Sequence, residues 1–188
     1  MNYWLITDTH FNHRKLQGPG GRSGDWENKL WKGMAAVPGE DTLIHLGDVC
    51  IGGDEDVHQR FQQLQCRKVL VLGNHDSKSN QWYQQRGWDF VCDGIELAYM
   101  GEQLFLSHCP LMPSGRYTRN VHGHTHGDLH RADESADWYD PSYHVDLSPE
   151  LVGYAPLRLD SLVKSWKKKP NLADSGNELR NQHDFVGG

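Results

Sequence analysis

The sequence contains three short apolar runs, and each run leads directly into polar residues that can perform chemistry. The runs YWLIT, TLIHL and KVLVL are followed by Asp8-Thr9-His10, by Gly47-Asp48 and by Gly73-Asn74-His75-Asp76. Short runs rich in Leu, Val and Ile that are bounded by glycine are typical of buried strands. In open α/β sheets, ligands bind beyond the carboxyl ends of the strands. The sequence therefore predicts a functional site at one edge of a sheet.

Helical patterns separate these runs. Residues 25–36 and 54–65 carry apolar side chains at helical spacing. Strands that alternate with helices predict the α/β class, with at least part of the sheet parallel. After residue 94 the pattern changes to an antiparallel hairpin over residues 95–108, an extended segment near residue 145 and a last helix over residues 159–169.

Composition predicts one globular domain in a reducing compartment. A chain of 188 residues with 37% hydrophobic residues can bury a core of its own. We expect this domain at residues 1–169, followed by a polar, mobile tail at residues 170–188. The net charge of -6 argues against an overall polyanion-binding role, and no apolar run is long enough to span a membrane. Four scattered cysteines and no visible secretory signal predict reduced thiols and a cytoplasmic protein.

The stretch VHGHTHGD, residues 121–128, holds three of the twelve histidines. His122, His124 and His126 occupy alternate positions, so an extended segment would point all three to the same face. The glycines before His124 and after His126 would let the backbone bend so that the imidazoles converge. Taken alone, the stretch fits a metal site and a His-rich surface loop with adventitious metal affinity equally well.

The residues after the apolar runs form a mixed oxygen and imidazole set. Such ligands suit Mn²⁺, Fe, Zn²⁺, Ni²⁺ or Co²⁺ better than Ca²⁺ or a structural zinc. Eight candidates are too many for one ion and suit two, which can activate a water for in-line displacement when they lie about 3.5–4 Å apart. The candidates are Asp8, His10, Asp48, Asn74, His75, His108, His124 and His126.

The ordered series D-x-H, G-D, G-N-H-D, a lone His108 and G-H-x-H resembles the motifs of the calcineurin-like metallophosphoesterase family. The opening DTHFNH and the small size are similar to the short, uncapped bacterial and phage branch of that family. The resemblance implies a four-layer α-β-β-α sandwich of two mixed sheets. It also implies two divalent ions, with Mn²⁺ as the first candidate, and a phosphoester substrate.

The resemblance also assigns a role to each matching position. Asp8, His10 and His126 would hold one metal, and Asp48 would bridge both metals. Asn74, His108 and His124 would hold the second. His75 would act near the leaving group and would be oriented by Asp76.

Several further positions have two interpretations. Asn12, His13 and Arg14 follow the first motif and could contact the substrate, or they could form a solvated turn. His122 lies one residue outside the G-H-x-H pattern and suits a supporting or strand position better than a ligand. His45, in the middle of a predicted strand, is expected in the core.

The sequence favours a phosphodiesterase acting on a nucleotide or a nucleic-acid end through a metal-bridging hydroxide. The segment GDVCIGG lacks the arginine that protein phosphatases of the family carry after their second motif, and GNHD replaces the commoner GNHE. A phosphomonoesterase acting on a terminal phosphate or a phosphoprotein is the alternative. A non-catalytic interaction scaffold would be expected to have lost ligands, and this chain has lost none. No membrane partner is expected, and the sequence does not define an oligomeric state.

Overall fold

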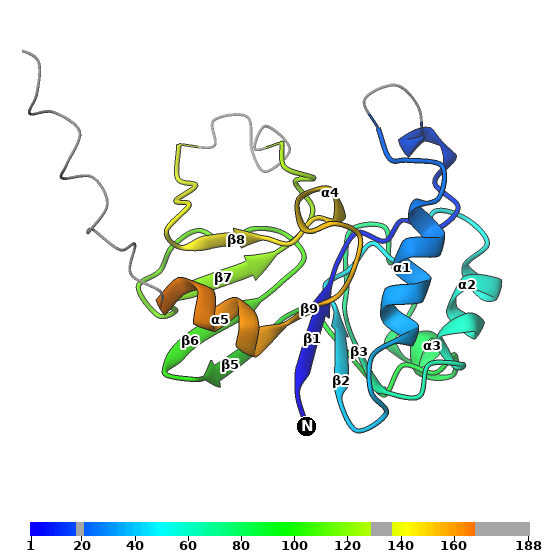
Figure 1. Cartoon of the computed structure of the whole chain (residues 1–188), viewed down its shortest axis with the longest axis horizontal. Coiled ribbons are helices and arrows are strands. Elements are labelled where there is room, and N and C mark those ends of the chain that lie inside the picture. Colours follow the sequence, from blue (N-terminus) through cyan, green and yellow to red (C-terminus); the bar gives the residue numbers. More distant parts are fainter. Residues whose placement is uncertain (18–20, 129–136, 168–188) are drawn as a thin grey trace, which may run out of the picture.

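The strands form two mixed sheets. The structure, a computed structural model, describes residues 1–17, 21–128 and 137–167 (Figure 1). In the first sheet the strand order is β4-β3-β2-β1-β9, and in the second it is β5-β6-β7-β8. The expected α/β class with two mixed sheets is confirmed.

The first sheet is built from the three apolar runs. They form β1 (Tyr3–Ile6), β2 (Thr42–His45) and β3 (Arg67–Val71), which are parallel to one another. A fourth parallel strand, β4 (Phe90–Cys92), pairs with β3, whereas β9 (Leu157–Arg158) runs antiparallel to β1. Because β1, β2 and β3 are parallel neighbours, the polar residues that follow them meet at one edge.

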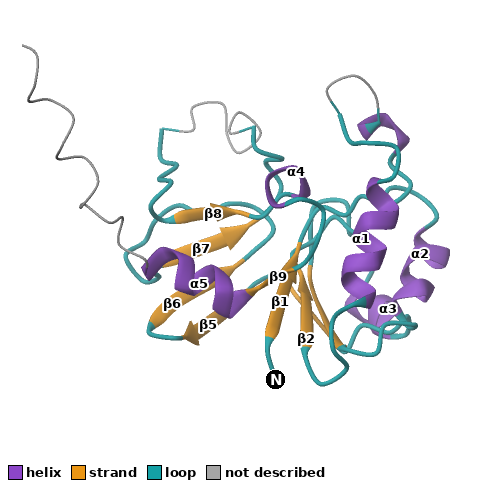
Figure 2. Ribbon diagram, viewed as in Figure 1, coloured by secondary structure: helices purple, strands orange, loops and turns teal. Residues whose placement is uncertain are grey.

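Three helices cover one face of the first sheet (Figure 2): α1 (Trp26–Ala35), α2 (Asp54–Phe61) and α3 (Asn80–Gln84). Their apolar side chains, including Trp26, Leu30 and Phe61, pack in one core with Leu70 of β3. The helix expected over residues 54–65 ends earlier, at Phe61. The next backbone amides, those of residues 62–64, bond to carbonyls three residues back, which tightens the chain into turns.

The second sheet begins with the expected hairpin, β5 (Ile95–Tyr99) and β6 (Glu102–Leu106). The turn uses Met100 and Gly101, which both have positive φ, as two-residue hairpin loops require. Two parallel strands follow, β7 (Arg119–His122) and β8 (His144–Asp146). Leu104 and Val121 of this sheet share a second apolar core with residues of β1, β2 and β3.

The remaining described elements are short, apart from the last helix. They are the 3₁₀ turn η1 (Arg14–Leu16), α4 (Pro149–Val152) and α5 (Leu159–Lys167). α5 packs against β1 and β9. The expected tail at residues 170–188 and the end of the last expected helix lie outside the described residues. Within residues 1–17, 21–128 and 137–167, no helix has the length and apolar character needed to cross a membrane.

Candidate metal centre

The eight candidate residues all lie just beyond strand ends. Asp8 and His10 follow β1, Asp48 follows β2, and Asn74 and His75 follow β3. From the second sheet, His108 follows β6, whereas His124 and His126 follow β7. The site is therefore assembled where the carboxyl ends of five strands from both sheets approach one another.

The first group consists of Asp8, His10 and His126. Oδ1 of Asp8 lies 3.6 Å from Nε2 of His10 and 3.6 Å from Nε2 of His126. The two imidazole nitrogens are 3.2 Å apart. Oδ1 of Asp8 is buried and has no hydrogen-bond partner. A buried carboxylate oxygen that faces two imidazole nitrogens without a hydrogen bond of its own suits a metal ligand, because an unpaired buried polar atom is otherwise costly.

The charge state of Asp8 fits this role. Burial alone would raise the pKa of its carboxyl group. The neighbouring imidazoles of His10, His108 and His126 act in the opposite direction and hold this pKa well below its usual range. Asp8 is therefore a carboxylate, as a metal ligand must be.

The second group is formed by Asn74, His108 and His124. Nε2 of His108 lies 3.0 Å from Oδ1 of Asn74 and 3.2 Å from Nδ1 of His124. Nδ1 of His108 lies 2.8 Å from the carbonyl oxygen of Leu46. Because a carbonyl oxygen can only accept, Nδ1 carries the proton and Nε2 of His108 presents its lone pair to the site.

Asp48 lies between the two groups. Its Oδ2 is 3.5 Å from Nε2 of His10 and 3.5 Å from Nε2 of His108. One carboxylate oxygen thus faces one imidazole of each group, as a bridging ligand between two ions would. The other oxygen, Oδ1, accepts a hydrogen bond from the backbone amide of His75 at 2.9 Å.

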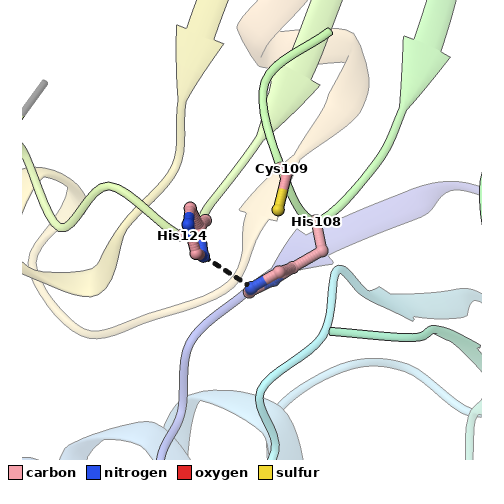
Figure 3. Close-up of side chains that lie close together, drawn as sticks. All are labelled: His108, Cys109 and His124. Atoms are coloured by element: carbon pink, nitrogen blue, oxygen red, sulfur yellow. Dashed lines mark hydrogen bonds between the residues drawn. The ribbon is translucent and has the colours of Figure 1, made fainter. Parts of the chain in front are cut away.

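Cys109 also lies at the second group, which the sequence interpretation did not include. Its Sγ and the ligand atoms of His108 and His124 lie within 4.8 Å of one another (Figure 3). Burial raises the pKa of the Cys109 thiol, and the nearby carboxylates of Asp48 and Asp8 raise it further. Both effects favour the neutral thiol over the thiolate, which is the form that binds metals.

The loops of the site have an unusual backbone. Five candidate ligands have positive φ: Asp8 (48°), His10 (44°), Asp48 (59°), His124 (69°) and His126 (52°). Residues with a side chain rarely adopt this conformation, and such residues cluster at functional sites. Contacts between loops hold it: the amides of Asp8 and His10 donate to the carbonyls of Gly47 and Asp48.

Two motif glycines are required by the close approach of these loops. A Cβ added at Gly73 would lie 2.3 Å from Oδ1 of Asp48, and one added at Gly123 would lie 2.0 Å from Oδ2 of Asp8. Both distances are shorter than any non-bonded contact between such atoms. The glycines therefore let neighbouring loops bring their carboxylates into the site.

Asp76 is directed at backbone amides and not at the His75 ring. Asp76 accepts hydrogen bonds from the backbone amides of Asp48 (2.7 Å), Gly73 (2.9 Å) and Val49 (3.2 Å). Among the described residues, no hydrogen bond joins Asp76 to the His75 ring. The carboxylate is directed at the loop after β2, so Asp76 fixes the backbone that carries Asp48. The His75 ring faces Asp48 instead, with Nε2 at 3.9 Å from Oδ2, and its side chain is 45% exposed.

His122 and His45 are both buried. His122 ends β7, and its Nε2 lies 3.1 Å from the Tyr139 hydroxyl, apart from both groups. His45 accepts a hydrogen bond from the amide of Gly47 through Nδ1, and its Nε2 lies 2.9 Å from Oγ1 of Thr9. Burial lowers the pKa of His45 to about 3, so this ring is neutral and connects the loops after β1 and β2.

The candidate substrate contacts differ in their surroundings. The side chain of Asn12 donates to the carbonyl of Gly52, so it connects two loops. The His13 ring lies beside the site, with its centroid 5.5 Å from that of His10. Arg14 is exposed in η1.

Two residues that the sequence interpretation missed, Arg22 and Glu150, support the first group. Oε1 of Glu150 lies 3.0 Å from Nδ1 of His126 and 2.8 Å from Nε of the buried Arg22. Burial would raise the pKa of Glu150, but its hydrogen bonds with His126 and Arg22 lower this pKa to about 2. No local sequence pattern reveals this pair, because the two residues lie 128 positions apart in the chain.

The chain is similar to a known protein family and to an archaeal protein. The family model described as calcineurin-like phosphoesterase matches residues 1–172. An uncharacterized protein of Methanocaldococcus jannaschii is 26% identical over 177 residues, which cover 88% of this chain and 91% of that protein.

Two solved structures are also similar to this chain. The crystal structure of a protein of unknown function from Aquifex aeolicus is 22% identical, covers 87% of this chain and 98% of its own, and has a TM-score of 0.66. That likeness supports the fold. A structure described as a novel archaeal phosphodiesterase is 19% identical, covers 78% of this chain and 82% of its own, and has a TM-score of 0.48.

We predict that Gly123→Ala disrupts the site. The new methyl group would lie 2.0 Å from Oδ2 of Asp8 and 2.1 Å from Oγ1 of Thr7, so the loops must separate. We expect lower metal content and a loss of about 1–3 kcal/mol in the free energy of unfolding. Elemental analysis and urea unfolding measure both. Gly24→Ala is the matched control, because no atom lies within 4 Å of the added Cβ. Wild-type metal content and stability in Gly123→Ala would contradict the close packing of the loops.

Proposed function

The chain belongs to the calcineurin-like phosphoesterase family, a family of hydrolases of phosphoester bonds, and we propose that it is a dinuclear metal-dependent phosphodiesterase. Its proposed substrate is a nucleotide or a nucleic-acid end. The observation that carries the dinuclear assignment is the position of Asp48, whose Oδ2 lies 3.5 Å from an imidazole nitrogen of each group. We also propose residues 1–169 as one domain with the tail at residues 170–188.

The proposed metal ligands follow the two groups. Asp8, His10 and His126 would hold the first ion, Asn74, His108 and His124 would hold the second, and Asp48 would bridge them. The residues fit such ions, because Oδ1 of Asp8 is buried without a hydrogen bond and the donors are oxygen and imidazole nitrogen. We propose Mn²⁺ as the first candidate, with Fe, Zn²⁺, Ni²⁺ and Co²⁺ as alternatives. Two bound ions would supply charge stabilisation of the phosphate and an activated water.

His75 is the proposed general acid. Its ring lies at the solvent side of the site, 45% exposed, with its centroid 5.5 Å from that of the buried His10. A leaving oxygen on the solvent side would be within reach of this imidazole, which could donate a proton as the P–O bond breaks. Asp76 is proposed as a positioning residue that holds the Asp48 loop, because its carboxylate binds three backbone amides.

The surroundings of Asp48 favour diesters over monoesters. The chain after Asp48 carries Val49 and Cys50, so this loop offers no cation to a phosphate. Arg22, whose Nη2 lies 3.4 Å from Nδ1 of His126, is buried and paired with Glu150. A phosphomonoester dianion carries one more negative charge than a diester, and the segment from Val49 to Gly53 supplies no arginine to balance it. Of the expected substrate contacts, His13 and Arg14 remain available, whereas the Asn12 amide already binds Gly52.

We predict two divalent ions per chain. Asp48→Asn should lower the metal content because the substitution removes the charge shared by both ions. His124→Ala and His126→Ala should each lower it as well. His122→Ala is the control, since its ring bonds to Tyr139 and lies apart from both groups. Elemental analysis and calorimetric titration measure stoichiometry and affinity. A single ion that is retained in Asp48→Asn would refute the dinuclear site.

We predict that kcat/KM is higher for diesters than for monoesters. The assay combines apo protein with each candidate metal and with bis(p-nitrophenyl) phosphate, p-nitrophenyl phosphate, 2′,3′-cyclic nucleotides and short oligonucleotides. Asp48→Asn, prepared in parallel, shows whether a contaminating phosphatase contributes. A monoester preference that holds across several metals would instead favour the phosphomonoesterase.

We predict that His75→Ala separates proton transfer from metal binding. General acid catalysis contributes about 10²–10⁴-fold where the leaving oxygen needs a proton. The variant should keep both ions, lose little activity on p-nitrophenyl diesters and lose far more on nucleotide diesters. The measurement is kcat/KM across leaving groups of rising pKa, with metal content determined alongside. Equal losses across the series would show that His75 stabilises the phosphate or the loop instead.

A further inference from the structure

We infer that the buried Arg22 and its partner Glu150 form a positioning pair that sets the affinity of the first metal position through His126. This inference rests on the proposed function, because it takes His126 as a ligand. Neither residue belongs to the motif series. Both act from outside it, Arg22 from the chain before α1 and Glu150 from α4.

Glu150 fixes the orientation and the tautomer of the His126 ring. Its Oε1 lies 3.0 Å from Nδ1 of His126. Nη2 of Arg22 is farther from this nitrogen, at 3.4 Å. A carboxylate can only accept, so the closer contact places the proton on Nδ1 and leaves the lone pair on Nε2, which faces Oδ1 of Asp8 at 3.6 Å. A ligating imidazole whose far nitrogen donates to a carboxylate is held in place and made more basic, which strengthens its bond to a metal.

Arg22 fixes both Glu150 and the loop after β1. Its Nε donates to Oε1 of Glu150 at 2.8 Å, and its Nη1 donates to the carbonyl oxygen of Thr9 at 3.1 Å. Thr9 lies between Asp8 and His10, the two residues of this loop that have positive φ and belong to the first group. The Arg22 guanidinium therefore restrains all three candidate ligands of the first group. It holds Asp8 and His10 through the loop after β1, and it holds His126 through Glu150.

The pair is also arranged to balance charge. The side chain of Arg22 is 1% exposed, and the rings of Trp26 and Tyr154 lie 4.7 Å and 5.9 Å from its guanidinium carbon. A buried guanidinium so close to a cation site would repel the ion unless a carboxylate offset its charge. Glu150 supplies that carboxylate next to the His126 ring. Removing Glu150 therefore both frees the ring and leaves a positive charge beside the first ion.

The test compares Glu150→Gln with Glu150→Leu. Glutamine can still accept from Nδ1 of His126 but lacks the charge, whereas leucine removes both. We expect Glu150→Gln to bind one of the two ions more weakly than the wild type does. Glu150→Leu should bind the same ion about 10–100-fold more weakly. The other ion should keep its wild-type affinity in both variants. Arg22→Met should weaken the same ion. Calorimetric titration of apo protein with Mn²⁺ and with Zn²⁺ measures each step, and His126→Ala identifies the step that belongs to the first position.

Asp25→Asn is the control, because it removes one carboxylate of an exposed ion pair with Lys29 on α1. Wild-type affinity for both ions in Glu150→Leu would overturn the inference, as would equal weakening of both ions, which indicates a general structural role. A different result would refute the proposed function itself, namely that His126→Ala binds both ions with wild-type affinity. Thermal unfolding of each apo variant confirms that the compared proteins are folded.

Discussion

The carboxylate of Asp8 joins the two sheets at the site, and the other contacts there are arranged around it. Oδ2 accepts hydrogen bonds from Thr7 on its own loop and from the backbone amide of His124 on the loop after β7. Oδ1 faces His10 and His126. One buried side chain thus connects the loops of both sheets through one oxygen and presents the other to the first group. Sheet packing and metal binding are therefore coupled through this residue.

The strained loops explain why the site needs the rest of the fold. A residue with a side chain costs about 1–3 kcal/mol when it is held in a sparsely populated backbone conformation. Asp8, His10 and Asp48 are all in this state, and bonds between the loops hold them there. His45 and Asp76 add further restraints, because each accepts a hydrogen bond from a backbone amide in the segment from Gly47 to Val49. Buried polar side chains outside the ligand set thus stabilise the geometry of the ligands.

The sequence predicted the strands and the gathering of eight polar residues because both depend on local patterns. Each apolar run forms a strand, and parallel neighbours bring their ends together without further information. The sequence could not predict side-chain direction within a loop. Asp76 follows His75 in the chain, yet its carboxylate reaches the amides of another loop. Arg22 and Glu150 were missed because their pairing depends on tertiary structure alone, and short elements such as α4 and β9 leave no periodic signal.

Each candidate metal position takes ligands from both sheets. The first combines Asp8 and His10 with His126, and the second combines Asn74 with His108 and His124. The distance between two bound ions would therefore follow the angle at which the sheets pack. Apolar side chains of both sheets, among them Leu104 and Val121, pack together in the core between them. Substitutions of these remote residues could retune catalytic rate or metal preference while every ligand stays unchanged, which gives evolution a route to new specificities through the hydrophobic interior.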